Sequence, residues 1–166
     1  SDVCSSDLGT TYRIAVDGIN EGLGAVTGTV IVSLNPAAST NQFSNDLFAK
    51  AQDLTGDRGQ ASGYTVFASK EEGEPNHGGF PASKSVWYSW VAPTNGVATF
   101  DTVGSAYNTV VAVYTGDALA SLTPVASDDD SGGNGASRVA FAAVKGTKYR
   151  IAVDSKDAAF GVLRVN

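Results

Sequence analysis

Apolar and polar residues alternate along most of the chain, and this period of two predicts β-strands rather than helices. The alternation is clearest near the C-terminus, where Tyr149, Ile151 and Val153 are expected to form the buried face of one strand. Arg150 and Asp154 are expected to face outwards from the same strand. This pattern therefore predicts a β-sheet with one buried face.

Further strands follow from the same pattern. Residues 109–114 are nearly all apolar, which predicts a central strand covered on both faces. Asn45 and Asp46 precede a short apolar pattern that predicts a single helical turn. The remaining expected strands lie at residues 12–17, 29–34, 64–68, 85–92, 97–103, 122–126, 137–144 and 161–165. Short strands separated by Gly, Pro, Asn and Asp predict an all-β fold, an antiparallel β-sandwich or barrel.

An internal repeat sets the domain organisation. The segment Gly9–Asp17 returns as Gly146–Asp154, with eight of nine positions identical. The second copy ends a long β-rich stretch, so residues 42–166 are interpreted as a complete module. Residues 9–35 are then the C-terminal hairpin of a preceding, partial repeat, and residues 36–41 are a linker. An isolated hairpin is marginal in water, so the first copy is expected to pair with a preceding module, this module or a neighbouring chain.

Residues 1–8 fit nothing downstream and resemble a translated sequencing-adapter string. They are interpreted as a non-native segment, and Cys4, the only cysteine of the chain, lies within it. A single cysteine forms no internal disulfide.

Charge and hydropathy exclude some functions. The net charge of −6 and the pI near 4.5 argue against nucleic acid as a partner, because phosphate binding needs a basic surface. They suit an extracellular protein or a binder of divalent cations. No apolar run approaches the ~18–20 residues of a membrane span.

A family resemblance emerges from the order of several short segments. They are residues 45–49, 70–77, 85–90, 110–116, 126–130 and 146–154. In this order they resemble the bacterial pre-peptidase C-terminal domain. The resemblance implies a jelly-roll-like β-sandwich that is non-catalytic, secreted or displayed on the cell surface, and often appended to hydrolases or repeated in tandem. Relatives of that family include collagen-binding domains that hold calcium.

Two acidic loops are candidates for a calcium site. Ca²⁺ takes six to eight oxygen ligands from flexible loops. If the loops meet at one end of the sandwich, these oxygens would enclose a Ca²⁺ cofactor; the alternative is a pair of solvated turns. The candidate ligands are Asp128, Asp129 and Asp130 in one loop and Glu72, Glu74 and Asn76 in the other.

Three aromatic residues, Trp87, Tyr88 and Trp90, are candidate binding residues for a sugar face. Alternation places Trp87 on one face of its strand and the other two on the opposite face, so at least one face is expected to be core. His77, the only histidine, has no accompanying nucleophile motif, and a structural hydrogen bond is the favoured interpretation.

The sequence thus predicts a non-catalytic module that binds or spaces, not an enzyme. Its expected partners are neighbouring repeats or identical chains, and an extracellular protein or polysaccharide. The alternative is a structural subunit of an extracellular fibre, assembled by β-strand addition through the N-terminal hairpin.

Overall fold

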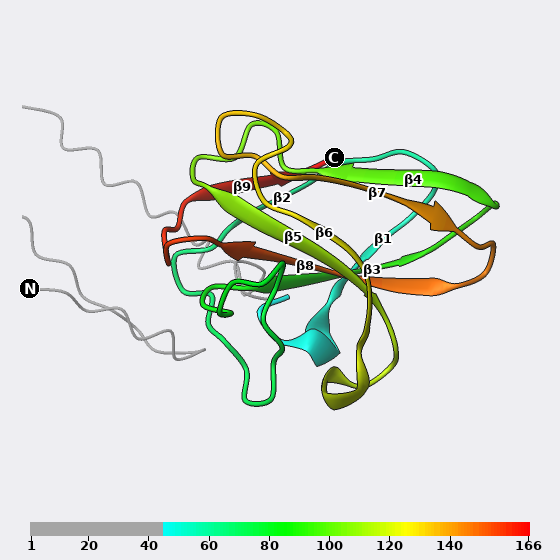
Figure 1. The fold of residues 1–166 in the computed structure, drawn as a ribbon, viewed down its shortest axis with the longest axis horizontal. Coiled ribbons are helices and arrows are strands. Elements are labelled where there is room, and N and C mark those ends of the chain that lie inside the picture. Colours follow the sequence, from blue (N-terminus) through cyan, green and yellow to red (C-terminus); the bar gives the residue numbers. More distant parts are fainter. Residues whose placement is uncertain (1–44) are drawn as a thin grey trace, which may run out of the picture. The chain divides into compact units, whose positions relative to one another are not determined.

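The computed structural model describes residues 45–166 of the chain. These residues contain nine strands and two short 3₁₀ helices (Figure 1). The expected adapter segment, hairpin and linker lie outside these residues, as do the strands expected at 12–17 and 29–34. The elements are η1 (Phe48–Lys50), β1 (Gln52–Leu54), β2 (Ala61–Tyr64), β3 (Val86–Val91), β4 (Gly96–Asp101), β5 (Thr109–Thr115), η2 (Leu119–Ser121), β6 (Thr123–Asp128), β7 (Arg138–Ala143), β8 (Lys148–Ser155) and β9 (Val162–Val165).

One layer is a five-stranded sheet in the order β1-β3-β8-β5-β6. Its neighbours run antiparallel except for β1 and β3, which pair in parallel from Gln52 opposite Tyr88 to Leu54 opposite Trp90. The sequence did not predict β1, because three residues carry no usable alternation. Strand β8 is the centre of this sheet, since it pairs with β3 on one side and β5 on the other.

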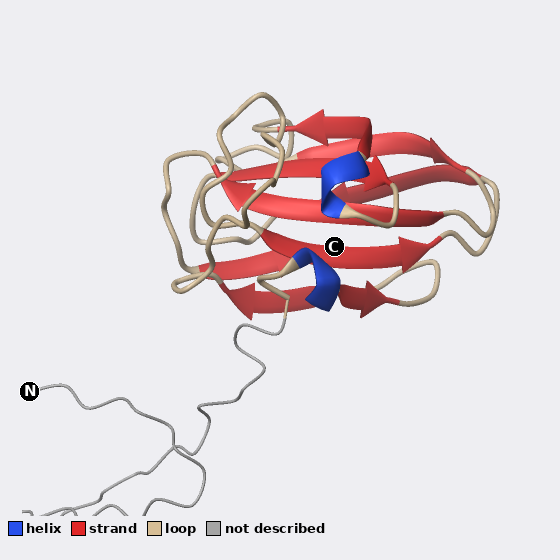
Figure 2. Cartoon of the chain, turned by 90° about the horizontal axis from the view of Figure 1, so that it is seen from below, coloured by secondary structure: helices blue, strands red, loops and turns tan. Residues whose placement is uncertain are grey.

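The second layer consists of two antiparallel ribbons, β2-β9 and β4-β7. Backbone hydrogen bonds between Asp101 and Asn166, of 3.1 and 2.8 Å, join the end of β4 to the residue that follows β9. Figure 2 shows the two layers of strands. The predicted all-β sandwich is therefore confirmed for the described residues.

The core lies between the layers. Tyr149, Ile151 and Val153 on β8 are buried there, as predicted, and Leu163 and Phe141 contribute from the opposite layer. The strand expected at 64–68 is misplaced, because the strand here is β2 at Ala61–Tyr64 and shares only Tyr64 with the prediction. It ends at Tyr64, and the next residues form a turn in which the Ala68 amide donates to the carbonyl of Thr65 at 3.1 Å.

The outer face of the five-stranded sheet is covered as well. Asp154 was expected to face outwards and does lie on this outer face, but it is buried there, with only 1% of the residue exposed. Its carboxylate accepts hydrogen bonds from the backbone amides of Ser83 and Lys84, at 2.9 and 2.7 Å, and so anchors the loop of residues 65–85 over the sheet. Arg150 is also largely covered, with its guanidinium 4.7 Å from the centre of the Phe48 ring.

Within residues 45–166, no helix has the length and apolar character needed to cross a membrane.

Candidate functional site

His77 lies at the centre of a sealed polar cluster beneath the 65–85 loop. Its side chain is fully buried, with Nε2 2.9 Å from Glu74 Oε1 and Nδ1 2.8 Å from the Tyr114 hydroxyl. Trp87 packs edge-on against the imidazole, with ring centres 5.4 Å apart, and Phe48 packs edge-on against Trp87 at 5.1 Å. The structural hydrogen bond predicted for His77 is therefore confirmed.

Burial and hydrogen bonding act in opposite directions on this cluster. Burial alone would raise the pKa of Glu74, but hydrogen bonds from His77, Ser85 and the Glu71 amide outweigh it and hold the pKa below the ordinary value. Burial, followed by the charges of Glu74 and Asp154, raises the pKa of Tyr114 to about 12. Glu74 is therefore a carboxylate near neutral pH and Tyr114 is a protonated phenol. The His77 imidazole connects the two through one hydrogen bond to each.

This cluster lacks the parts of a catalytic site. Among the described residues, the His77 imidazole hydrogen-bonds to Glu74 and Tyr114, and no serine, threonine or cysteine side chain bonds to its ring nitrogens. A nucleophile activated by a base would need such a contact and access for a substrate. The cluster instead fixes the loop to the sheet.

The acidic residues of the β6–β7 loop are each held by partners within the protein. Asp128 accepts hydrogen bonds from the Ser131 hydroxyl and from the backbone amides of Ser131 and Arg138, the latter two at 3.0 and 2.7 Å. Asp129 and Asp130 both pair with the ammonium of Lys156, at 3.2 Å for Asp130. These contacts keep the loop folded on itself.

The two acidic loops do approach each other, but the group between them is a lysine. The Lys156 ammonium also lies 5.1 Å from the centre of the Phe80 ring, which belongs to the 65–85 loop. Of the three candidates in that loop, Glu74 is committed to His77, whereas Glu72 and Asn76 have exposed side chains with no carboxylate or imidazole cluster around them.

The candidate ligands do not fit calcium as they are arranged. No group of three or more His, Cys, Asp or Glu side chains within residues 45–166 has the spacing of a metal site. A divalent ion would have to displace the Lys156 ammonium from Asp129 and Asp130. Calcium binding by the chain stays a prediction, and thermal melts with Ca²⁺ and with EDTA are the measurement that tests it.

The three candidate aromatic residues have different surroundings. Trp87 and Tyr88 are 0% and 1% exposed, so the binding role considered for them is wrong. The 65–85 loop and η1 cover Trp87, and the opposite layer covers Tyr88. Trp90, near the end of β3, remains partly exposed.

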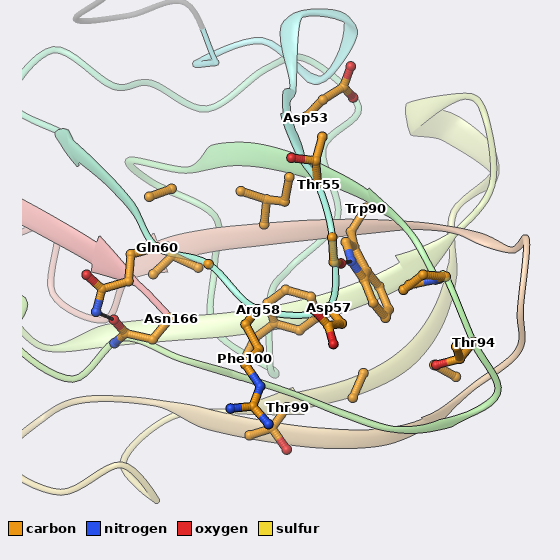
Figure 3. A pocket seen from close by; sticks show the side chains of 18 of the residues that line it. Asp53, Thr55, Asp57, Arg58, Gln60, Trp90, Thr94, Thr99, Phe100 and Asn166 are labelled. Atoms are coloured by element: carbon orange, nitrogen blue, oxygen red, sulfur yellow. Dashed lines mark hydrogen bonds between the residues drawn. The ribbon is translucent and has the colours of Figure 1, made fainter.

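Trp90 lines a cleft of about 470 Å³ at the open edge of the sandwich (Figure 3). Residues 55–60 form this edge, because they carry the chain from β1 in one layer to β2 in the other. The indole Nε1 donates a hydrogen bond to the carbonyl of Gly56 at 2.9 Å. Phe100 and Tyr149 pack against the indole, with ring centres 5.6 and 5.9 Å away, so its orientation is fixed.

Polar side chains surround this aromatic surface. The Gln60 side-chain amide donates to Asn166 Oδ1 at 2.9 Å, while five further polar side chains of the cleft make no hydrogen bond or ion pair with any described residue. The unpaired side chains at the cleft are Asp57, Arg58, Thr55, Thr94 and Thr99. Of this site, the sequence pattern indicated only Trp90, because residues 55–60 have the composition of an ordinary surface turn.

No protein-family model matches the chain, and no curated protein matches it.

Proposed function

We propose that the chain is a non-catalytic β-sandwich module of a secreted tandem-repeat surface protein or enzyme appendage, and that it acts in binding or spacing. The place of β8 in its sheet carries the proposal. The resemblance to the pre-peptidase C-terminal domain, which includes the β8 segment, also supports it.

The repeated segment corresponds to a strand that requires two neighbours. Gly146–Asp154 covers most of β8, which is hydrogen-bonded on both edges and buried on both faces. The matching segment Gly9–Asp17 carries the same apolar alternation. The central position in the described sheet is already taken by β8, so the first copy is best explained as the central strand of a second module.

The arrangement of side chains favours binding over turnover. The His77–Glu74 pair is sealed from solvent. The cleft at Trp90 is lined by neither histidine nor cysteine, and one of its two carboxylates, Asp53, is held by the hydroxyl of Ser89. The residues at the cleft therefore offer contacts for a ligand but no nucleophile paired with a base.

A pair of equivalent substitutions tests the assignment of two modules. Ile151 is fully buried at the centre of the sandwich, and Ile14 is its counterpart in the first copy. Ile151→Asp places an unpaired carboxylate in the core and is expected to abolish the cooperative unfolding of the described module. Ile14→Asp, in the same full chain, is expected to leave that transition unchanged.

Differential scanning calorimetry on both variants and the parent chain provides the measurement. If Ile14→Asp removes the same transition as Ile151→Asp, the first copy is part of the described sandwich and the proposal of a preceding module fails. The fibre alternative concerns residues outside the described part and stays a prediction. It would appear as concentration-dependent polymers that are lost when residues 1–40 are deleted.

A further inference from the structure

We infer that the cleft at Trp90 is a binding site for a neutral oligosaccharide chain. The inference names a ligand class for the binding role proposed above and rests on that role. It stands on three features of the cleft, which are an oriented aromatic surface, a rim of unpaired polar groups and a local charge that disfavours anions.

The aromatic surface is held in place before any ligand arrives. Packing against Phe100 and Tyr149, together with the hydrogen bond to Gly56, leaves the Trp90 indole without an unpaired polar atom. The part of the indole that borders the cleft is therefore apolar. The C–H face of a sugar ring is apolar too, so contact between the two buries both surfaces without leaving a hydrogen-bonding group unpaired.

The rim supplies hydrogen-bonding groups of both kinds. The Arg58 guanidinium donates, the Asp57 carboxylate accepts, and the hydroxyls of Thr94 and Thr99 do either. A sugar hydroxyl is also donor and acceptor, so a ring stacked on Trp90 would present its edge hydroxyls to matching groups. The cleft volume of about 470 Å³ lies within the ~300–1,000 Å³ of ligand sites, and its open edge suits a chain that continues beyond it.

Anionic ligands fit less well than neutral ones. The charged side chains of the cleft are Asp53, Asp57 and Arg58, which leaves a net negative charge in a protein whose net charge is −6. A phosphate or sulfate group would be repelled. An extended peptide could pair with an edge of β1 or of β4, which line the cleft and each have one strand partner among the described residues, so strand addition is the rival outcome of the test.

Isothermal titration calorimetry on the full chain tests the inference. The probes are cellohexaose, xylohexaose, maltohexaose, mannohexaose and chitohexaose. A heparin hexasaccharide is the anionic arm, and a decapeptide of alternating threonine and valine, which can pair as a strand, is the peptide arm. At least one neutral hexasaccharide is expected to bind with a dissociation constant of about 1 mM or lower. Overturning results are no neutral binder in this set, or binding of heparin or of the decapeptide alone.

Variants locate the site. Arg58→Ala and Thr99→Ala change exposed rim side chains, and Trp90→Phe keeps an aromatic ring of smaller area. Each of the three is expected to weaken binding about tenfold, the equivalent of one good polar or stacking contact. Lys145→Ala and Phe160→Ala remove an exposed cation and an exposed aromatic ring outside the cleft, and are expected to bind as the parent does. If the rim variants bind like the parent, the cleft is not the site.

The two proposals fail in different ways. An oligosaccharide that binds and is then cleaved, seen as new reducing ends after incubation, would contradict the non-catalytic function but not the site. Absence of binding would remove the ligand assignment and leave the calorimetric comparison of Ile14 with Ile151 intact.

Discussion

Trp87 and Trp90 lie on the same strand and face opposite sides of one sheet, yet they have opposite relations to solvent. Trp87 is on the outer face, which a sandwich normally leaves open, and it is fully buried. Trp90 is on the inner face, which a sandwich normally closes, and it borders a cleft. Loops that cross the sheet therefore decide which tryptophan a ligand can reach.

The cover over Trp87 is held by polar contacts. Asp154 anchors the end of the 65–85 loop, and Glu71 accepts a hydrogen bond from the backbone amide of Phe48 in η1. Between them, Glu74 and His77 tie the loop to Tyr114 on β5. This second, small core is separated from the main core by the sheet itself. It shields this part of the outer face from solvent.

The cleft at Trp90 lies where the chain crosses from one layer to the other and no loop of the described residues packs over the inner face. Residues 55–60 leave one layer and enter the other, and the Gly56 carbonyl accepts a hydrogen bond from the indole on the way. They bring no apolar side chain to fill the gap. The inner face is thus closed by packing at its centre and left open at this edge.

Removing each tryptophan gives the largest expected contrast. Trp87→Ala is expected to lower the free energy of unfolding by about 3–5 kcal/mol, because it opens a cavity in a fully buried cluster. Trp90→Ala is expected to lower it by about 2 kcal/mol, because part of the indole already contacts solvent. Urea unfolding followed by circular dichroism measures both. Equal losses would mean that the two environments do not differ as described.

Acid is expected to weaken the cover over Trp87 through Glu74. The pKa of Glu74 in the folded protein is lowered from 4.5, so its contribution to stability is complete above that value. The contribution is lost as the pH falls through the lower, folded-state pKa. Glu74→Gln is expected to reduce the free energy of unfolding by about 1–3 kcal/mol at neutral pH and to flatten its dependence on pH below 4.5.

The matched control for this substitution is Glu72→Gln in the same loop, where the side chain is exposed. It should leave both the stability and its acid dependence close to those of the parent. Identical pH profiles for Glu74→Gln and the parent would show that the Glu74–His77 contact does not hold the loop.

Fluorescence quenching gives the smallest and most direct contrast. With Trp87→Phe, the remaining emission comes from Trp90, and with Trp90→Phe it comes from Trp87. Acrylamide is expected to quench Trp90 several times more strongly than Trp87 in the folded protein, because only Trp90 contacts solvent. In urea the two should be quenched alike. Equal quenching in the folded state would contradict the sealed environment of Trp87.

Local pattern was enough to place most of the strands. The segments expected around Trp87, Val111, Phe141 and Ile151 became β3, β5, β7 and β8, because alternation with a period of two and short apolar runs are properties of neighbouring residues. The same rule correctly put Trp87 and Trp90 on opposite faces. It was misleading at residues 64–68, where Thr65 turns the chain after only four residues of strand.

The sequence by itself therefore determined the all-β class, the main strands and the division of side chains between two faces. Only the tertiary structure decided that Asp154 is buried, that Lys156 lies among the acidic residues and that β1 joins the sheet in parallel. The same holds for the cleft at Trp90. Each of these depends on contacts between segments tens of residues apart, and the exposure of a face is set by what packs on it rather than by its own pattern.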